Sequence, residues 1–319
     1  MQLNGVMRTA EAIRRELAKA IIGMDEVLDQ TIVALLAGGH VLIEGLPGTA
    51  KTRLVRALSL TVQGTFHRIQ FTPDLMPADI IGVNVYHAPS AEFRFTPGPV
   101  FCDLLLADEI NRAPAKTQSA LLEAMQEQQV SVDRERHELS PVFTTFATQN
   151  PVEYEGTYPL PEAQLDRFLL KIRAGYPEKD QEVHILERCH TGFNAARTET
   201  FGIEGCTTVH DLAEARKAVR HVEAVKEIME YVTGIIRATR SLPSLTLGAS
   251  PRAAVMLFLA SKGMALLRGR CYVTPDDVRD IATPVLRHRI MLNPESEIEG
   301  MTADQCVQRV LERVEVPRF

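Results

Sequence analysis

The first apolar positions of the chain repeat at helical spacing. Residues 6–20 carry such a stripe, which predicts an amphipathic helix. The stripe consists of Val6, Ala10, Ile13, Leu17 and Ile21. Gly23 interrupts the pattern and residues 24–37 resume it, so we expect two helices with a break between them.

A short apolar run follows the Gly38-Gly39 pair that closes the second helical pattern. Residues 40–44 favour a β-strand, and residues 52–62 again show a helical pattern. The glycine-containing segment 45–52 therefore joins a predicted strand to a predicted helix.

Residues 66–101 lack a long regular pattern. Short alternating segments occur at residues 67–71 and 93–95, and prolines separate them. These prolines are Pro73, Pro77, Pro89, Pro97 and Pro99. We expect an inserted hairpin or loop region here rather than a regular crossover.

Buried-strand patterns return after this region. Residues 104–107 and 142–147 are apolar runs that predict strands, and residues 117–129 between them predict a helix. Alternating strand and helix signals are typical of an α/β fold, in which helices cover a parallel sheet.

Strand signals stop near residue 177. The helical patterns beyond it cover residues 178–190, 210–240, 250–268 and 275–287, and residues 191–205 are loop-like. Ser250-Pro251 and Thr274-Pro275 supply a capping residue followed by a first-turn proline. The chain therefore divides into a predicted α/β domain, residues 1–177, and a smaller all-helical domain, residues 178–319.

The bulk composition narrows the class of protein. The 319 residues are 45% hydrophobic and 24% charged, which is typical of a soluble globular protein of about two domains. A net charge of −6 and a pI near 5.9 argue against nucleic acid as a partner. The chain begins without a signal-peptide pattern, and no apolar run approaches the roughly 18 residues that span a bilayer. We therefore expect a cytoplasmic protein without a membrane span.

The segment 45–52 has the composition of a phosphate-binding loop. Backbone N–H groups of a tight strand-to-helix loop bind anionic oxygens. Lys51 would then place its charge on the β- and γ-phosphates, and Thr52 would offer a hydroxyl to Mg²⁺. The general pattern has glycine where this chain has Ala50. Because alanine tolerates a helical backbone, we expect the site to be retained; the alternative is a glycine-rich turn without a ligand.

Two acids end the predicted strand 104–107. In a parallel sheet Asp108 would lie beside the loop, where Mg²⁺ needs a contact, and Glu109 could polarise the attacking water as general base. The alternative is a strand that ends in solvated acids, which is common. The loop upstream favours the catalytic interpretation.

Three further polar residues are candidates for the same reaction. Asn150 could sense the γ-phosphate and orient the water, unless it belongs to an ordinary Asn-Pro turn. Arg167 could offset charge on the transferred phosphate, unless it forms only a surface salt bridge with Asp166 or a neighbour. Arg252 could reach the phosphates from the helical domain, unless it is a solvated first-turn arginine.

The order of these elements resembles the MoxR-type AAA+ ATPases of the helix-2-insert clade over nearly the whole chain. The segments that carry the resemblance are residues 21–23, 37–42, 45–52, 68–79, 108–114, 121–125, 147–151, 161–168, 249–253, 269–270 and 273–278. Family members have alanine or glycine at the position of Ala50, so that residue is no departure. Pro114-Ala115 stands where two prolines are frequent.

The resemblance implies a role for each candidate. Its nucleotide-binding positions are Ile22, Gly23, Gly45, Pro47, Gly48, Thr49, Ala50, Lys51, Thr52, Arg53 and Arg252. Its catalytic positions are Lys51, Glu109, Asn150 as sensor 1, Arg167 as a finger acting on a neighbouring subunit, and Arg252 as sensor 2. Its Mg²⁺ positions are Thr52 and, through water, Asp108. The insertion near residues 66–101 matches the clade.

The resemblance also implies how such a protein works. It implies a P-loop NTPase fold with an all-α lid, ATP or ADP with Mg²⁺, and a ring, usually a hexamer. It further implies chaperone-like remodelling, maturation or metal-cofactor insertion of a client protein, with a von Willebrand factor A domain protein as partner. Two alternatives remain at this point, a nucleotide-gated regulatory scaffold with little turnover and a nucleic-acid motor, against which the acidic charge argues.

Overall fold

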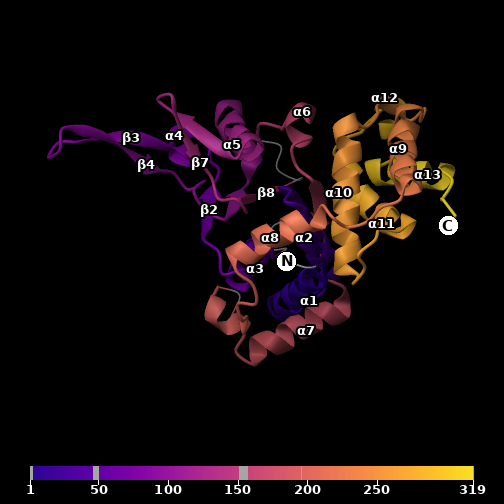
Figure 1. Cartoon of the computed structure of the whole chain (residues 1–319), viewed down its shortest axis with the longest axis horizontal. Coiled ribbons are helices and arrows are strands. Elements are labelled where there is room, and N and C mark those ends of the chain that lie inside the picture. The colour runs from indigo at the N-terminus through magenta and orange to yellow at the C-terminus, as the bar shows by residue number, and fades with distance from the viewer. Residues whose placement is uncertain (1–2, 46–49, 151–156, 195, 319) are drawn as a thin grey trace.

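A parallel sheet of five strands lies at the centre of the first half of the chain. The computed structural model describes residues 3–45, 50–150, 157–194 and 196–318 (Figure 1). The sheet has the order β2-β5-β8-β1-β9, and all neighbours pair in parallel. Its strands are β1 (Val41–Gly45), β2 (Phe66–Gln70), β5 (Leu104–Asp108), β8 (Thr144–Gln149) and β9 (Leu170–Ala174). The α/β class predicted from the sequence is confirmed.

Helices cover both faces of this sheet. One layer contains α1 (Leu3–Ala20), α2 (Asp25–Ala37) and α3 (Lys51–Thr61), and the other contains α4 (Pro77–Ile81) and α5 (Ala115–Glu127). Successive strand residues point to opposite faces. Val41 and Ile43 accordingly belong to the core beneath the first layer, and Leu42 belongs to the core beneath the second.

The predicted insertion contains a hairpin of β3 (Gly82–His87) and β4 (Glu92–Pro97), which extends away from the sheet (Figure 1). Its base is narrow: a Cβ on Gly98 would lie 2.3 Å from the Ile80 carbonyl oxygen. The insertion is shorter than predicted, because residues 66–70 form the edge strand β2 of the central sheet. In β2 only Ile69 is buried, and its neighbours Arg68 and Gln70 are exposed. This difference between the two faces of the strand explains why polar and apolar residues alternate along it.

Several short elements escaped the sequence prediction. Besides β9, they include a second hairpin and a short helix in the first half of the chain and two helices near its end. These are β6 (Gln129–Val132), β7 (Glu135–Glu138), α6 (Glu162–Leu165), α12 (Pro294–Ile298) and α13 (Ala303–Arg313).

The segment after β9 returns to the first helical layer before the lid begins. It contains α7 (Lys179–His190), the short helix η2 (Thr198–Phe201) and α8 (Val209–Val219). Helix α8 packs on α1 and α2, and η2 packs on α3. By these contacts, the first part of the predicted second domain, residues 178–319, packs on the first helical layer, and α9 (Lys226–Arg240) follows it.

The lid consists of α9, α10 (Pro251–Leu267), α11 (Pro275–Leu286), α12 and α13, together with a small pair of strands, β10 (Leu245–Leu247) and β11 (Met291–Leu292). The predicted helix 210–240 is two helices. The residues between them pair elsewhere, since Glu223 exchanges backbone hydrogen bonds with Cys271 and Val273. Every helix within the described residues is too short or too polar to span a bilayer.

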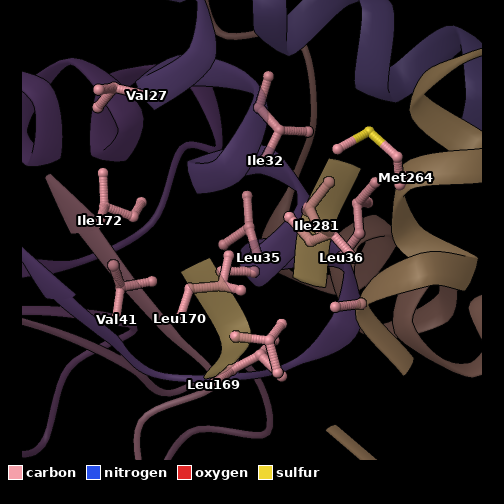
Figure 2. Close-up of a cluster of buried hydrophobic side chains, with 14 of the residues drawn as sticks. Val27, Ile32, Leu35, Leu36, Val41, Leu169, Leu170, Ile172, Met264 and Ile281 are labelled. Atoms are coloured by element: carbon pink, nitrogen blue, oxygen red, sulfur yellow. The ribbon is translucent and has the colours of Figure 1, made fainter. Parts of the chain in front are cut away.

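The lid and the sheet share one hydrophobic core. Figure 2 shows Leu35 and Leu36 of α2 beside Met264 of α10 and Ile281 of α11. Strand residues, Leu170 among them, belong to the same cluster. At the other end of α10, Arg252 and Met256 line a cavity with Ala37 and Gly38, so the start of α10 lies against the end of α2.

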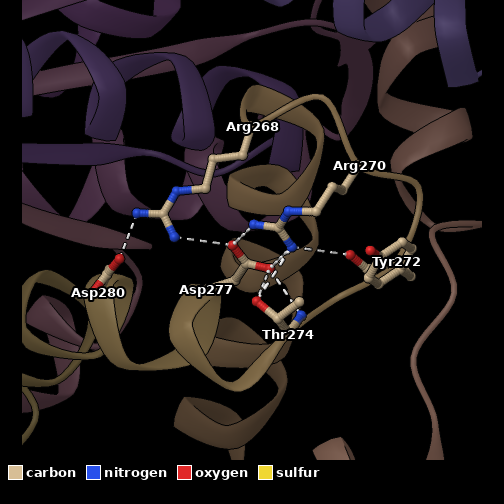
Figure 3. Close-up of polar contacts among 6 residues, drawn as sticks. All are labelled: Arg268, Arg270, Tyr272, Thr274, Asp277 and Asp280. Atoms are coloured by element: carbon tan, nitrogen blue, oxygen red, sulfur yellow. Dashed lines mark hydrogen bonds and ion pairs between the residues drawn. The ribbon is translucent and has the colours of Figure 1, made fainter.

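A buried carboxylate holds the start of α11 (Figure 3). Asp277 is fully buried and accepts hydrogen bonds from Arg270 at 2.6 and 2.7 Å, from Arg268 at 3.1 Å and from the Thr274 backbone at 2.9 Å. Burial raises the pKa of this carboxyl, but hydrogen bonds from Arg270 and Thr274 outweigh burial and leave the pKa below its usual value. Arg268 also pairs with Asp280.

The Asp277 network predicts an acid-dependent stability. Asp277→Asn should lower the free energy of unfolding at pH 7 by about 3 kcal/mol, because the neutral amide loses the charged hydrogen bonds that the buried carboxylate accepts from Arg270 and Arg268. The folded-state pKa is depressed, so the wild-type carboxylate contributes fully above the unfolded pKa of about 3.9 and loses its contribution as pH falls through the folded pKa. Denaturant titrations between neutral and acid pH measure the difference.

The exposed Asp280 serves as the matched control. Asp280→Asn should change the free energy of unfolding at pH 7 by about 1 kcal/mol or less, because exposed ion pairs are weak. Equal losses in the two variants would show that the buried carboxylate has no special role.

Candidate functional site

The candidate residues lie at two opposite edges of the central sheet. We call the edge at which the five parallel strands end the carboxyl edge, and the edge at which they begin the amino edge. Asp108 is the last residue of β5, Glu109 and Asn150 directly follow β5 and β8, and Lys51 begins the helix after β1. All four residues therefore share the carboxyl edge. Open α/β sheets bind ligands at this edge.

The candidate phosphate loop starts at the last residue of β1 and ends where α3 begins. Residues 46–49, and with them the predicted contacts of Pro47, Gly48 and Thr49, lie outside the described residues. Lys51 donates from Nζ to the Gly45 carbonyl oxygen at 2.5 Å, so its side chain points toward the end of β1. Thr52 follows in the first turn of α3 and is half-buried.

The backbone of Ala50 differs from the sequence expectation. Its φ of 57° and ψ of 16° are left-handed, where a helical backbone was expected. This region costs a residue with a Cβ about 1 kcal/mol relative to glycine. The loop therefore keeps the conformation that glycine favours although the residue is alanine.

The Asp108 carboxylate is buried and both of its oxygens have hydrogen-bond donors. Thr148 Oγ1 of β8 donates to Oδ1 at 2.6 Å. Arg68 of β2 donates to Oδ2 from Nη2 at 2.7 Å and from Nε at 3.2 Å. Three adjacent strands, β2, β5 and β8, therefore fix the position of this carboxylate.

The Glu109 carboxylate is half-buried beside Asp108 and is held by two side chains of its own subunit. Gln70 Nε2 donates to Oε2 at 2.7 Å, and Arg112 Nε lies 3.2 Å from the same oxygen. The Glu109 backbone is left-handed, with φ of 57°, and its N–H donates to Thr148 Oγ1 at 2.9 Å. The left-handed turn takes Glu109 out of the strand direction.

Thr148 is the residue that sequence reasoning missed. Its hydroxyl donates to Asp108 and accepts from the Glu109 N–H, so one buried group positions both acids. The available signal was a polar residue inside a buried strand, two positions before Asn150. The Arg68 and Gln70 contacts were missed because they depend on the pairing of β2 with β5.

The structure also describes the predicted positions Asn150, Ile22, Gly23 and Arg53. Asn150 directly follows β8 and is buried. Gly23 has a φ of 72° in the break between α1 and α2, next to the half-buried Ile22. The half-buried Arg53 points elsewhere, since its guanidinium lies 5.6 Å from the centre of the Phe193 ring.

Arg167 and Arg252 lie at the amino edge. Arg167 precedes β9, and the nearby Leu169 N–H donates to the carbonyl of His40, which precedes β1. Arg252 stands in the first turn of α10. Both arginines line one cavity of about 250 Å³. The structure therefore brings the two arginines together at this cavity.

Arg289 of the lid binds the segment that carries Arg167. The Arg289 guanidinium is buried and pairs with Asp166 at 2.7 Å. It also donates to the carbonyl of Leu169 at 3.1 Å and to that of Phe168. The predicted alternative, an ion pair between Arg167 and Asp166, is not formed, because Asp166 pairs with Arg289.

Family comparisons agree with this two-part architecture. Residues 40–170 match the family described as ATPase family associated with various cellular activities (AAA). Residues 237–310 match an AAA lid domain, which starts inside α9.

Individual relatives are similar over nearly the whole chain. The chain is 46% identical to the uncharacterized protein YeaC of Bacillus subtilis, over 94% of this chain and 92% of the relative. It is 42% identical to chaperone MoxR1 of Mycobacterium tuberculosis, over 98% and 83%, and 31% identical to protein MoxR of Methylorubrum extorquens, over 97% and 95%.

One solved structure is similar in both fold and sequence. It comes from Cytophaga hutchinsonii and is provisionally named an ATPase. The TM-score is 0.89 and the identity 38%, over 98% of this chain and 96% of that one.

The shared hydroxyl of Thr148 leads to a prediction. Thr148→Val keeps the shape but removes the donor to Asp108 and the acceptor for Glu109, so ATP turnover should fall about tenfold to a hundredfold. Thr148→Ser retains the hydroxyl and should keep most of the turnover. Steady-state phosphate release checks both variants; a valine variant as active as the serine variant would exclude this positioning role.

Proposed function

The chain belongs to the MoxR-type AAA+ ATPases, and from that membership we propose that it hydrolyses ATP with Mg²⁺ between two copies of itself to remodel a client protein. The similarity to a relative named as a chaperone supports the chaperone-like part of the proposal. We propose that the chain binds ATP and ADP and that it acts in the cytoplasm.

The observation that carries the proposal is the separation of the candidate residues between two edges. Strand β1 has five residues, so the sheet is about 16 Å deep between the loop and the amino edge. Arg167 cannot reach across this depth to its own loop. A head-to-tail contact would bring the amino edge of one copy to the carboxyl edge of the next, and closed repetition of that contact makes a ring, for which we propose six copies.

The residues at the carboxyl edge suit a magnesium nucleotide. Mg²⁺ takes one or two protein oxygens and completes its shell with water and phosphate oxygens. The Thr52 hydroxyl and the Asp108 carboxylate, the latter through water, are such a donor set. When bound, Mg²⁺ would neutralise charge on the β- and γ-phosphates, and Lys51 would add a positive charge next to them.

The proposed chemistry is the attack of water on the γ-phosphate. Glu109 accepts a proton from this water, Asn150 orients it, and the neighbour's Arg167 offsets the charge that develops on the transferred group. Glu109 must exchange its contacts with Gln70 and Arg112 for a contact with water before it can act. In the present arrangement, Gln70 and Arg112 therefore keep the Glu109 carboxylate in an inactive position.

The β3–β4 hairpin is the proposed contact with the client. Its exposed apolar side chains include Val83, Val85, Tyr86 and Phe93, and the two aromatic rings lie 5.3 Å apart. Exposed apolar groups of this kind favour protein contacts. We propose maturation or metal-cofactor insertion as the outcome for the client, with a von Willebrand factor A domain protein as partner.

Two other functions are weaker candidates. A nucleotide-gated scaffold would use the same loop but release little phosphate. A nucleic-acid motor would need a positive surface, against which the net charge of −6 argues.

Substitution of the proposed base tests the hydrolysis. Glu109→Gln should leave ATP affinity within a few-fold of the parent and lower phosphate release at least about a hundredfold, because the amide cannot accept the proton. Equilibrium dialysis with ATP and steady-state phosphate release measure the two quantities.

The matched control is Glu227→Gln, which makes the same change at an exposed position of α9. It should leave both quantities unchanged. Normal turnover in the Glu109→Gln variant would remove Glu109 as the base. A parent chain that binds ATP but releases no phosphate would favour the scaffold.

A further inference from the structure

The amino-edge cavity contains a third arginine that no part of the proposed mechanism has used. Arg220 follows the last residue of α8 and lines the same cavity as Arg167 and Arg252. We propose that Arg220 contacts the phosphates of the nucleotide held by the neighbouring copy, together with those two arginines. This inference rests on the proposed function and assigns that site a further residue.

Among the described residues, the three arginines of this cavity face no acidic side chain. The cavity is lined by Ala37, Gly38, Gly39, His40, Met125, Gln126, Gln128, Arg167, Leu169, Arg220, Arg252, Met256 and Leu259, none of which is acidic. Within the described part of the chain, no carboxylate pairs with Arg167, Arg220 or Arg252. Like charges repel one another, so the binding of an anion in this cavity is electrostatically favoured.

A fourth arginine makes the wall behind the cavity more positive. Arg216 lies against Gly38. Its partners among the described residues are uncharged oxygens, those of Leu35 at 3.0 Å, Pro141 at 3.4 Å and the Thr144 hydroxyl. Burial lowers the pKa of Arg216 to about 10, a value at which the group stays charged at neutral pH.

The one histidine of the cavity wall does not offset this charge. His40 is buried between the Met125 carbonyl and the Thr145 N–H, at 3.0 Å from each. Burial lowers the pKa of His40 to about 4, so it is neutral at pH 7. The local charge therefore comes from arginines alone.

The cavity suits the phosphate end of a ligand. A volume of about 250 Å³ lies below the range of about 300–1,000 Å³ that is typical of sites for whole small molecules. The base and sugar would stay with the copy that supplies the loop. Guanidinium groups match phosphate oxygens with several donors each, which a cluster of three can exploit.

Arg220 can be changed without disturbing the fold around it. Its side chain is exposed, and the contact that anchors the residue uses the backbone: Lys262 Nζ donates to the Arg220 carbonyl oxygen at 2.8 Å. An alanine at this position keeps that carbonyl. The variant therefore reports on the guanidinium.

The experiment measures steady-state ATP turnover of full-length chains, alone and mixed. Arg220→Ala should lower turnover about tenfold to a hundredfold, as expected for the loss of a hydrogen bond to a charged group. Arg237→Ala, at an exposed position of α9, should leave turnover unchanged and serves as control. Circular dichroism melting should be the same for both variants.

Mixing tells whether Arg220 acts on the neighbouring copy. An Asp108→Ala chain lacks its own metal contact but retains all amino-edge arginines. Added to Arg220→Ala chains, it should raise turnover above that of either variant alone, as it should with Arg167→Ala chains. Rescue of Arg167→Ala but not of Arg220→Ala would overturn the inference and leave the proposed function intact.

Two further results are decisive. One is turnover of Arg220→Ala within twofold of the parent while Arg167→Ala is inactive. This result would overturn the inference, because it would show that Arg220 does not contact the nucleotide. Absence of rescue for both arginine variants would instead contradict the shared site itself.

Discussion

All five strands of the sheet run in the same direction, and this constraint decides where each candidate residue can act. Parallel strands put every strand end on one edge, so Lys51, Asp108 and Asn150 lie together. The same polarity puts Arg167, which precedes β9, on the opposite edge. Packing of α10 against α2 adds Arg252 to that edge. On the proposed function, one chain therefore carries two half-sites at opposite edges of the sheet.

Local hydrogen bonds refine each half-site. At the carboxyl edge a threonine hydroxyl has one proton to donate and lone pairs to accept, so Thr148 can hold Asp108 and the Glu109 backbone at once. At the amino edge Arg289 holds Asp166 and the carbonyls beside Arg167. Because Arg289 follows α11, the lid is tied directly to the segment that carries Arg167.

Sequence periodicity predicted the central strands and most helices because their apolar residues recur with the period of a strand or of a helix. It missed β9, where Lys171 and Arg173 interrupt the apolar pattern and form ion pairs with Glu44. It also joined α8 to α9, because the pairing of Glu223 with residues 271–273 is a long-range effect. The place of Lys51, Asp108 and Glu109 at the carboxyl edge could be predicted from strand ends. Thr148 and the position of Arg252 could not, because they depend on packing between elements.

The central claim is that a complete site needs two copies of the chain, and dilution tests it most directly. ATP turnover per chain should be measured at saturating ATP over a range of protein concentrations, with the mass of the particles followed by light scattering. The account predicts that turnover per chain falls toward zero as the particles dissociate into single chains, and returns when the protein is concentrated again. Turnover per chain that stays constant while the mass falls to that of one chain would contradict it.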